Sequence, residues 1–242
     1  MKNYLLLFAC AATFLLSACQ REDDTDTQPA TAELILKLSH QIGDQPLVYD
    51  QKTYTNALGQ PYTVSEFRFF ISNIRLRNRS TGATYREPDS YHLVTPDPNQ
   101  EMTFEIVLSG IPPDEYDQVE FSIGIDNAHN YSLDQVGDLD PSSNMVWDWN
   151  TGYKFLLFEG RYKDRGLVYH IGSDFNYRTL HFNDRYVLRD RHTLDFGVDV
   201  GAIFGQPNPI DFEQNNVVMF QPISREVSQN YAKNMIRLLR FN

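Results

Sequence analysis

The sequence predicts an all-β protein, a single β-sandwich-like domain with a short C-terminal helix. From residue 33 onward, short runs rich in β-branched and aromatic residues alternate with Gly, Pro, Asn and Asp, a spacing typical of strands joined by tight turns. Many strands with tight turns favour two packed sheets. No internal repeat and no change of composition interrupts this region, so residues 33–242 are predicted to be one domain.

Seven runs are predicted as strands. They cover residues 33–39, 66–76, 102–108, 118–125, 154–158, 167–171 and 193–200. Turn-forming sequences lie between them: Ser-Thr-Gly at 80–82, Pro-Asp-Pro-Asn at 96–99, Ile-Pro-Pro-Asp at 111–114 and Lys-Asp-Arg-Gly at 163–166. The C-terminus departs from this pattern, because Ser228 is expected to cap a helix whose apolar face carries Ala232, Met235, Ile236 and Leu239.

Residues 1–18 are predicted to be a lipoprotein signal peptide. The charge of Lys2 precedes an apolar run from 4 to 16 that is too short to span a bilayer, and small residues lead into Cys19. The sequence Leu-Ser-Ala-Cys at 16–19 has the pattern of a lipobox, so we expect cleavage before Cys19 and lipidation of its sulfur. An ordinary secretory peptide is the alternative. Acyl chains on Cys19 would hold the protein to a membrane without a transmembrane helix.

Residues 19–32 are expected to form a flexible, lipid-anchored tether, because they are charged, small and proline-containing. Gln20 follows Cys19 where an aspartate would favour retention at the inner membrane, so the outer membrane is expected. The acidic cluster of Glu22, Asp23 and Asp24 resembles the export tag of Bacteroidetes surface lipoproteins, although acidic tethers are also simply solvated linkers. The expected location is the bacterial cell envelope, as an outer membrane lipoprotein that faces the periplasm or the cell surface.

Charge and cysteine content exclude several functions. The formal net charge is −11 and the chain has no basic block, which argues against nucleic acid as a partner. Cys10 leaves with the signal peptide and Cys19 is lipidated, so the mature fold has no thiol. A metal site must therefore use His, Met, Asp, Glu or backbone ligands, and cysteine-based zinc or iron–sulfur sites are excluded.

One long segment and five shorter pieces are distinctive. The long segment runs from 137 to 160 and contains Met-Val-Trp-Asp-Trp-Asn-Thr-Gly-Tyr at 145–153. The shorter pieces are His-Gln-Ile-Gly at 40–43, Val-Ser-Glu-Phe-Arg-Phe-Phe-Ile-Ser-Asn-Ile-Arg-Leu at 64–76, Tyr-His-Leu-Val at 91–94, Gly-Ile-Asp-Asn-Ala-His-Asn at 124–130 and His-Ile-Gly-Ser at 170–173. In this order and over residues 33–242, they resemble the MbnP-like family of copper-binding proteins. Any one piece is weak, but the combination is specific.

The resemblance implies an all-β fold, no catalysis and a mononuclear copper site. In characterised relatives that site looks like two histidines plus a tryptophan oxidised to kynurenine, two residues before the first histidine. Carried over by position, the histidines fall on His40 and His92. Leu38 stands where the tryptophan would be. Residues 38 and 40 of a strand share a face, so the geometry is expected to survive without the third group.

The histidines themselves are compatible with copper, because imidazole suits either of its oxidation states. None of the six histidines forms a closely spaced pair, so spacing alone announces no site. His170 lies in a matching piece after an apolar strand and is a third candidate ligand. His129, His181 and His192 are expected to be ordinary hydrogen-bonded imidazoles.

Two interpretations are possible for Trp147, Trp149 and Met145. With Leu38, they are candidates for the wall of a metal or ligand pocket, and the Met145 thioether would suit Cu(I). The alternative is that the two tryptophans, on one face of an extended segment, pack in the core and that Met145 fills a gap. A further set, Asp134, Asp138, Asp140 and Asn144, is expected to form a hydrogen-bonded loop rather than a calcium site, because it lacks EF-hand spacing.

The sequence is compatible with two functions. The leading hypothesis is a lipid-anchored copper-binding or copper-handling protein whose partner is a copper ion or a copper-carrying small molecule. The alternative is a metal-free surface module that binds a carbohydrate, a peptide or an outer-membrane partner through its aromatic residues. An enzyme is not expected, since the sequence has no Gly-x-Ser-x-Gly motif, no free cysteine and no glycine loop for phosphate.

Overall fold

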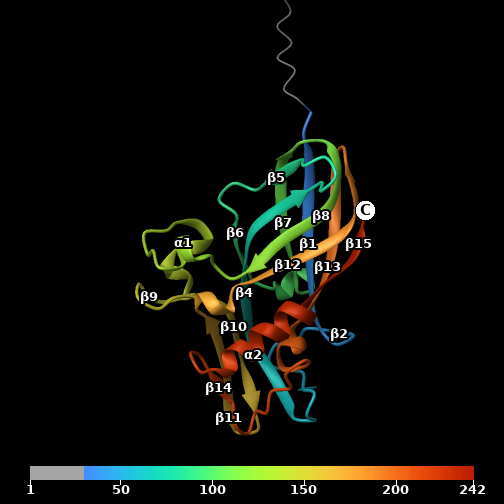
Figure 1. The fold of residues 1–242 in the computed structure, drawn as a ribbon. Coiled ribbons are helices and arrows are strands. Elements are labelled where there is room, and N and C mark those ends of the chain that lie inside the picture. The colour runs from blue at the N-terminus through green and yellow to red at the C-terminus, as the bar shows by residue number, and fades with distance from the viewer. Residues whose placement is uncertain (1–29) are drawn as a thin grey trace, which may run out of the picture.

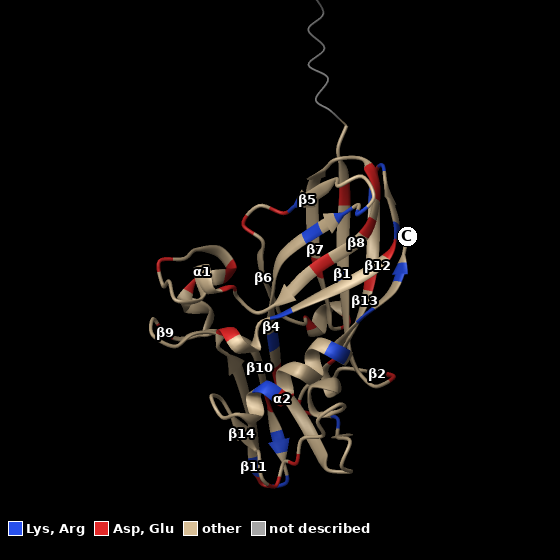
Figure 2. Ribbon diagram, in the orientation of Figure 1, with Lys and Arg blue, Asp and Glu red and all other residues tan. Residues whose placement is uncertain are grey.

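The computed structural model describes residues 30–242, which form two β-sheets packed face to face (Figure 1). The predicted signal peptide, Cys19 and most of the predicted tether lie outside the described residues. Within the described part, no helix is long and apolar enough to cross a membrane. Acidic and basic residues are interspersed over both sheets (Figure 2). The predicted all-β, sandwich-like fold is confirmed.

The first sheet is built around the N-terminal strand. Its order is β15-β13-β1-β2, and β7 also pairs with β1. The bounds are β1 Ala32–Ile42, β2 Gln45–Pro46, β7 Thr103–Ile111, β13 Arg191–Asp199 and β15 Ile236–Phe241. β13 runs parallel to β1 and β7 antiparallel to it, so segments far apart in sequence meet at the centre of the sheet.

The second sheet is larger and follows the order β12-β8-β4-β10-β11-β14. These strands are β4 Pro61–Arg77, β8 Asp114–Ile123, β10 Gly152–Tyr162, β11 Arg165–Gly172, β12 Arg178–Leu188 and β14 Val217–Val218. Four short strands extend it: β3 Tyr54–Thr55, β5 Thr84–Arg86, β6 Tyr91–Val94 and β9 Val146–Asp148. β4 is the longest strand and pairs with five of the others.

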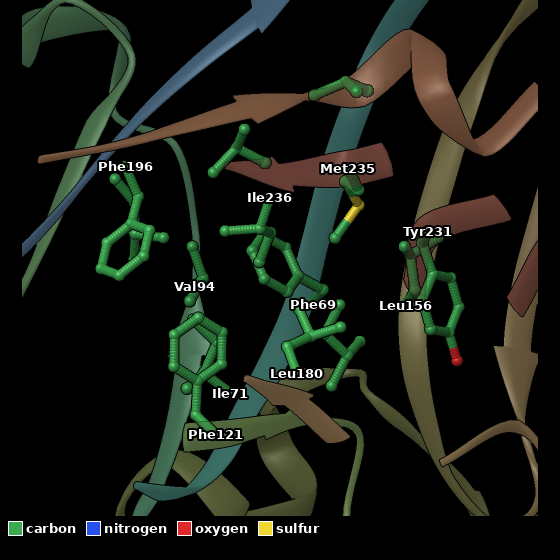
Figure 3. Close-up of a cluster of buried hydrophobic side chains, with 14 of the residues drawn as sticks. Phe69, Ile71, Val94, Phe121, Leu156, Leu180, Phe196, Tyr231, Met235 and Ile236 are labelled. Atoms are coloured by element: carbon green, nitrogen blue, oxygen red, sulfur yellow. The ribbon is translucent and has the colours of Figure 1, made fainter. Parts of the chain in front are cut away.

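Alternation along β4 separates two apolar clusters. Phe67, Phe69 and Ile71 point into the main core between the sheets, where Phe121 of β8 and Phe196 of β13 also pack (Figure 3). The intervening Phe70 belongs to a smaller cluster on the other face of the sheet, whose remaining buried members are Ile125, Leu139, Met145, Tyr153, Phe155 and Leu157. A strand with both faces covered reads as a nearly continuous apolar run, which explains the sequence of β4.

The helices are short. They comprise α1 Asn127–Asn130 and α2 Ile223–Asn230, the 3₁₀ segments Pro98–Gln100, Gly137–Leu139, Pro141–Ser143, Asp174–Asn176 and Val200–Phe204, and a π-helical segment Tyr231–Met235.

A short C-terminal helix is present, but its predicted position is wrong. Ser228 is not the cap: it lies inside α2, where its hydroxyl donates to the Arg225 carbonyl oxygen at 2.9 Å. The chain then leaves the helix at Met235, and both Ile236 and Leu239 belong to strand β15. Backbone pairing with β13 outweighs the helical spacing of these apolar residues.

The seven predicted strands are confirmed as parts of β1, β4, β7, β8, β10, β11 and β13, with shifted ends. Two longer strands, β12 and β15, were missed, as were the short strands β2, β3, β5, β6, β9 and β14. In β12 the polar sequence Asn183-Asp184-Arg185 interrupts the pattern, and this is where the pairing with β8 shifts register.

Candidate functional site

His40 lies where β1 changes its hydrogen-bonding partner. β7 pairs with β1 as far as Ser39, and β2 takes over at Gln41. Between these ladders, the His40 amide donates to the Met102 carbonyl oxygen at 3.1 Å and the His40 carbonyl oxygen accepts from the Leu47 amide at 3.1 Å. The pleat of β1 directs the imidazole inward, on the same face as Leu38, as the sequence predicted.

The His40 imidazole is buried and has one fixed partner. Its Nδ1 lies 2.8 Å from the Met102 carbonyl oxygen. Because a carbonyl only accepts, Nδ1 carries the proton and the lone pair of a neutral ring falls on Nε2. His40 is only 2% exposed, and its Nε2 has no hydrogen-bond partner among residues 30–242.

Burial also fixes the protonation state of His40. Desolvation lowers the pKa of the imidazole from 6.5 to about 4, and the bond to Met102 only partly opposes this. The rings of Phe67 and Phe69 lie edge-on, with centroids 6.2 and 6.1 Å from that of His40. At neutral pH the site therefore holds an uncharged imidazole with an unused lone pair in apolar surroundings.

A cleft of about 880 Å³ adjoins this position. Its lining includes Lys37, Ser39, His40, Asp44, Tyr49 and Met102. Two successive residues with positive φ, Glu101 at 54° and Met102 at 57°, turn the chain into β7 and place the Met102 carbonyl against the imidazole. A cleft of this size lies within the range of small-molecule sites.

His92 has a different environment. It lies on β6, paired with Ile71 of β4, and its Nε2 lies 2.8 Å from Glu87 Oε2. The same carboxylate oxygen accepts from the Ser90 hydroxyl at 2.5 Å. Strand alternation places His92 on the same side of the sheet as Val94 in the main core. His40, on the first sheet, and His92, on the second, thus both lie on the sides of their sheets that face the main core, but they have separate partners.

His170 lies on the opposite face of the second sheet. It pairs with Leu157, which in turn pairs with Arg68, and Arg68 alternates with Phe67 and Phe69. Its Nε2 lies 2.9 Å from Glu159 Oε1. Burial lowers the pKa of His170, although the bond to Glu159 opposes the effect. The structure does not bring His170 together with His40, and within residues 30–242 no three or more His, Cys, Asp or Glu residues group so as to hold a metal ion.

The predicted pocket-wall residues are also divided. Leu38 is fully buried in the main core beside His40, whereas Met145 is buried in the smaller cluster on the far side of the second sheet. Trp147 packs against Phe220 with ring centroids 4.6 Å apart. Trp149 is 69% exposed in the turn after β9, so the two tryptophans do not share a strand face as expected. The reason is Asp148, whose carboxylate accepts from the amides of Asn150 and Thr151 and turns the chain.

The remaining sequence expectations concern ordinary hydrogen bonding. Asp138 accepts from the Leu93 amide at 2.8 Å and Asp140 from the Ser142 amide at 2.8 Å, as in a hydrogen-bonded loop. His129, His181 and His192 each have a polar partner: Tyr91 and Asp126, Glu120, and the Asn242 carbonyl oxygen. Met102 was missed as a site residue, and its carbonyl role has no signal in a sequence.

Fold and site together define a sandwich-like β protein whose interior holds the neutral imidazole of His40, with a lone pair on Nε2 that has no partner among residues 30–242. The family model of MbnP matches residues 31–220, so the chain belongs to the MbnP family. Among solved structures, MbnP from Methylosinus trichosporium has a similar fold, with a TM-score of 0.50 and 16% sequence identity over 68% of this chain and 76% of that one. No curated protein matches the chain significantly in sequence. The membership supports a copper-related function at the level of the family.

Proposed function

We propose that the chain is a copper-handling protein of the cell envelope and that His40 Nε2 is its principal copper ligand. The observation that carries this is the buried, unpartnered Nε2, fixed in its tautomer by the Met102 carbonyl. A ligating histidine needs a neutral ring and a partner for its second nitrogen, and His40 has both. His92 and His170 instead direct Nε2 at carboxylates.

One imidazole alone does not complete the coordination of a copper ion, so further ligands are needed. Leu38 supplies no ligand atom, and the Met102 thioether is the other soft donor among the residues that line the cleft. The remaining ligands are therefore proposed to come from Met102 or from a copper-carrying small molecule seated in the cleft. Copper bound here would be stored or transferred, and we propose no catalysis. Lipidation at Cys19 and placement at the outer membrane complete the proposal.

Metal analysis of untagged protein after copper loading tests the proposal. Three matched variants, His40→Leu, His92→Leu and His170→Leu, each remove one imidazole, and circular dichroism confirms that each is folded. We expect His40→Leu to lose bound copper and the other two to retain it. Equal copper in His40→Leu and the parent would contradict the assignment.

A metal-free binding module is the second candidate function, and exposed aromatic residues favour it. Trp149 and Phe220 are 69% and 52% exposed, and Phe220 contacts Trp147. Exposed large aromatic residues are candidates for contacts with a ligand. Retention on an immobilised glycan or peptide that Trp149→Ala abolishes, in protein without copper, would favour this candidate.

A further inference from the structure

A second, separate cleft lies on the outer face of the second sheet, where β5, β4, β8 and β12 run side by side. The strand register places Arg86, Arg75, Glu120 and His181 in one row across these four strands. The cleft has a volume of about 310 Å³. Its lining includes Asn73, Arg75, Arg86, Glu120, Tyr177 and Thr179.

Glu120 is the buried charge around which this cleft is built. It is 5% exposed, and basic side chains surround its carboxylate. Arg75 donates to Oε1, His181 Nδ1 lies 3.2 Å from Oε2, and Arg77 lies 3.9 Å from the same oxygen. Buried ion pairs contribute little net stability compared with apolar packing, so stability alone does not account for such an arrangement.

The backbone is also unusual at this cleft. A β-bulge interrupts the pairing of β4 with β8 between Ser72 and Arg75, and Asn73 within it has a φ of 56°. The bulge directs the Asn73 amide toward two acceptors, Asp126 Oδ2 and the Tyr177 hydroxyl, each at 2.8 Å. Bulges and strained residues of this kind often re-aim side chains at functional sites.

Hydrogen-bond donors outnumber free acceptors in the cleft. Arg86 has no ion-pair or hydrogen-bond partner within the described part of the chain, and Arg75 bonds Glu120 through one nitrogen. The Tyr177 hydroxyl accepts from Asn73, and its own proton has no acceptor among residues 30–242. Both oxygens of Glu120 are engaged, as described above, and Glu87, which also lines the cleft, has Oε2 engaged and Oε1 without a partner among residues 30–242. The cleft therefore has hydrogen-bond donors that lack an acceptor, and its two guanidinium groups favour an acceptor with negative charge.

We infer that this cleft binds the oxyanion of a small organic ligand, a carboxylate or a phosphate, through Arg86 and Arg75. The protein as a whole is acidic, with a formal net charge of −11, so its general field repels anions. An anion must then be held by local, directed donors. The volume admits a body of about one sugar ring beside the charged group. This binding is independent of copper and of His40.

Titration calorimetry with three probes, sodium galacturonate, galactose and inorganic phosphate, tests the inference in low-salt buffer. Galactose matches galacturonate in ring and hydroxyl groups but lacks the carboxylate. Arg86→Gln removes one charge from an exposed side chain without a protein partner, so the fold is expected to be unaffected. Arg189→Gln, an exposed arginine of the turn after β12, is the control with the same change of charge.

We expect galacturonate or phosphate to bind, galactose not to bind, and Arg86→Gln to weaken binding by roughly tenfold or more, the loss expected for a charge-assisted hydrogen bond. Arg189→Gln should bind like the parent. Dependence on galacturonate indicates an acidic sugar, and dependence on phosphate a phosphorylated group. The inference is overturned if neither anion binds at millimolar concentration, if galactose binds as tightly, or if Arg86→Gln leaves the affinity unchanged.

Discussion

The buried imidazole of His40 predicts a specific dependence of stability on pH. In the folded, copper-free protein the pKa of His40 is about 4, whereas an unfolded histidine titrates at 6.5. Between these values the unfolded state binds more protons than the folded state. The free energy of unfolding therefore falls as the pH drops through this window, and the contribution of His40 is complete above pH 6.5.

The magnitude follows from the two pKa values. Each pKa unit corresponds to about 1.4 kcal/mol, so the full window is worth about 3 kcal/mol, and lowering the pH from 7 to 5 costs about 2 kcal/mol. The comparison variant is His40→Leu, which keeps an apolar side chain of similar size. The Met102 carbonyl still accepts from the backbone amide of residue 40, so it is not left without a partner. Removal of the unpartnered Nε2 offsets the loss of the hydrogen bond at Nδ1.

Urea denaturation of both copper-free proteins between pH 7 and 5 measures the effect. All other titrating groups are shared, so the difference between the two curves isolates His40. We expect the parent to lose about 2 kcal/mol more than His40→Leu over this range. Parallel curves would contradict this expectation, because they would mean that His40 takes up its proton in the folded state as readily as in the unfolded one.

Three further predictions concern packing and exposure. Phe69→Ala should lower the free energy of unfolding by about 3–5 kcal/mol, because its ring is fully buried in the main core, and a loss below about 1 kcal/mol in urea denaturation would contradict this core. Gly160→Ala places a methyl group 2.0 Å from the Thr63 carbonyl oxygen and should lower the free energy of unfolding by about 1–3 kcal/mol or more. Gly166→Ala is the control, because its methyl group meets open space and should not lower stability. Equal thermal melting points of the two variants would be incompatible with this register of β10 on β4. Trp149→Ala should change stability by less than about 0.5 kcal/mol, since the side chain is largely exposed, and a larger loss would show that the ring packs in solution.

Most of the fold could be predicted from the periodicity of the strands. Seven strands, the alternation that sets Leu38 and His40 on one face, and the sandwich of packed sheets follow from short-range patterns and turn residues. Strand β15 could not be recognised in this way, because its apolar residues also fit a helical face. Only pairing with β13, more than 35 residues earlier, decides between the two, as the match of Ile236 with Val198 illustrates.

The candidate site was harder to predict, because it depends on which residues meet across the fold. Of the three candidate histidines, only His170 lay inside a predicted strand, His40 followed the end of one and His92 lay in none, and no register between strands could be predicted. Register puts His170 on the opposite face of the second sheet and gives His92 a carboxylate partner. The unused lone pair of His40 depends on a carbonyl 62 positions away, which no local pattern encodes.

NMR of the histidine ring nitrogens, during addition of one equivalent of Cu(I), tests whether His40 is the copper ligand. Cu(I) is diamagnetic, so each imidazole reports separately. We expect the Nε2 resonance of His40 to shift and those of His92 and His170 to stay where they are. A spectrum in which His40 is unchanged and another histidine shifts would contradict this assignment.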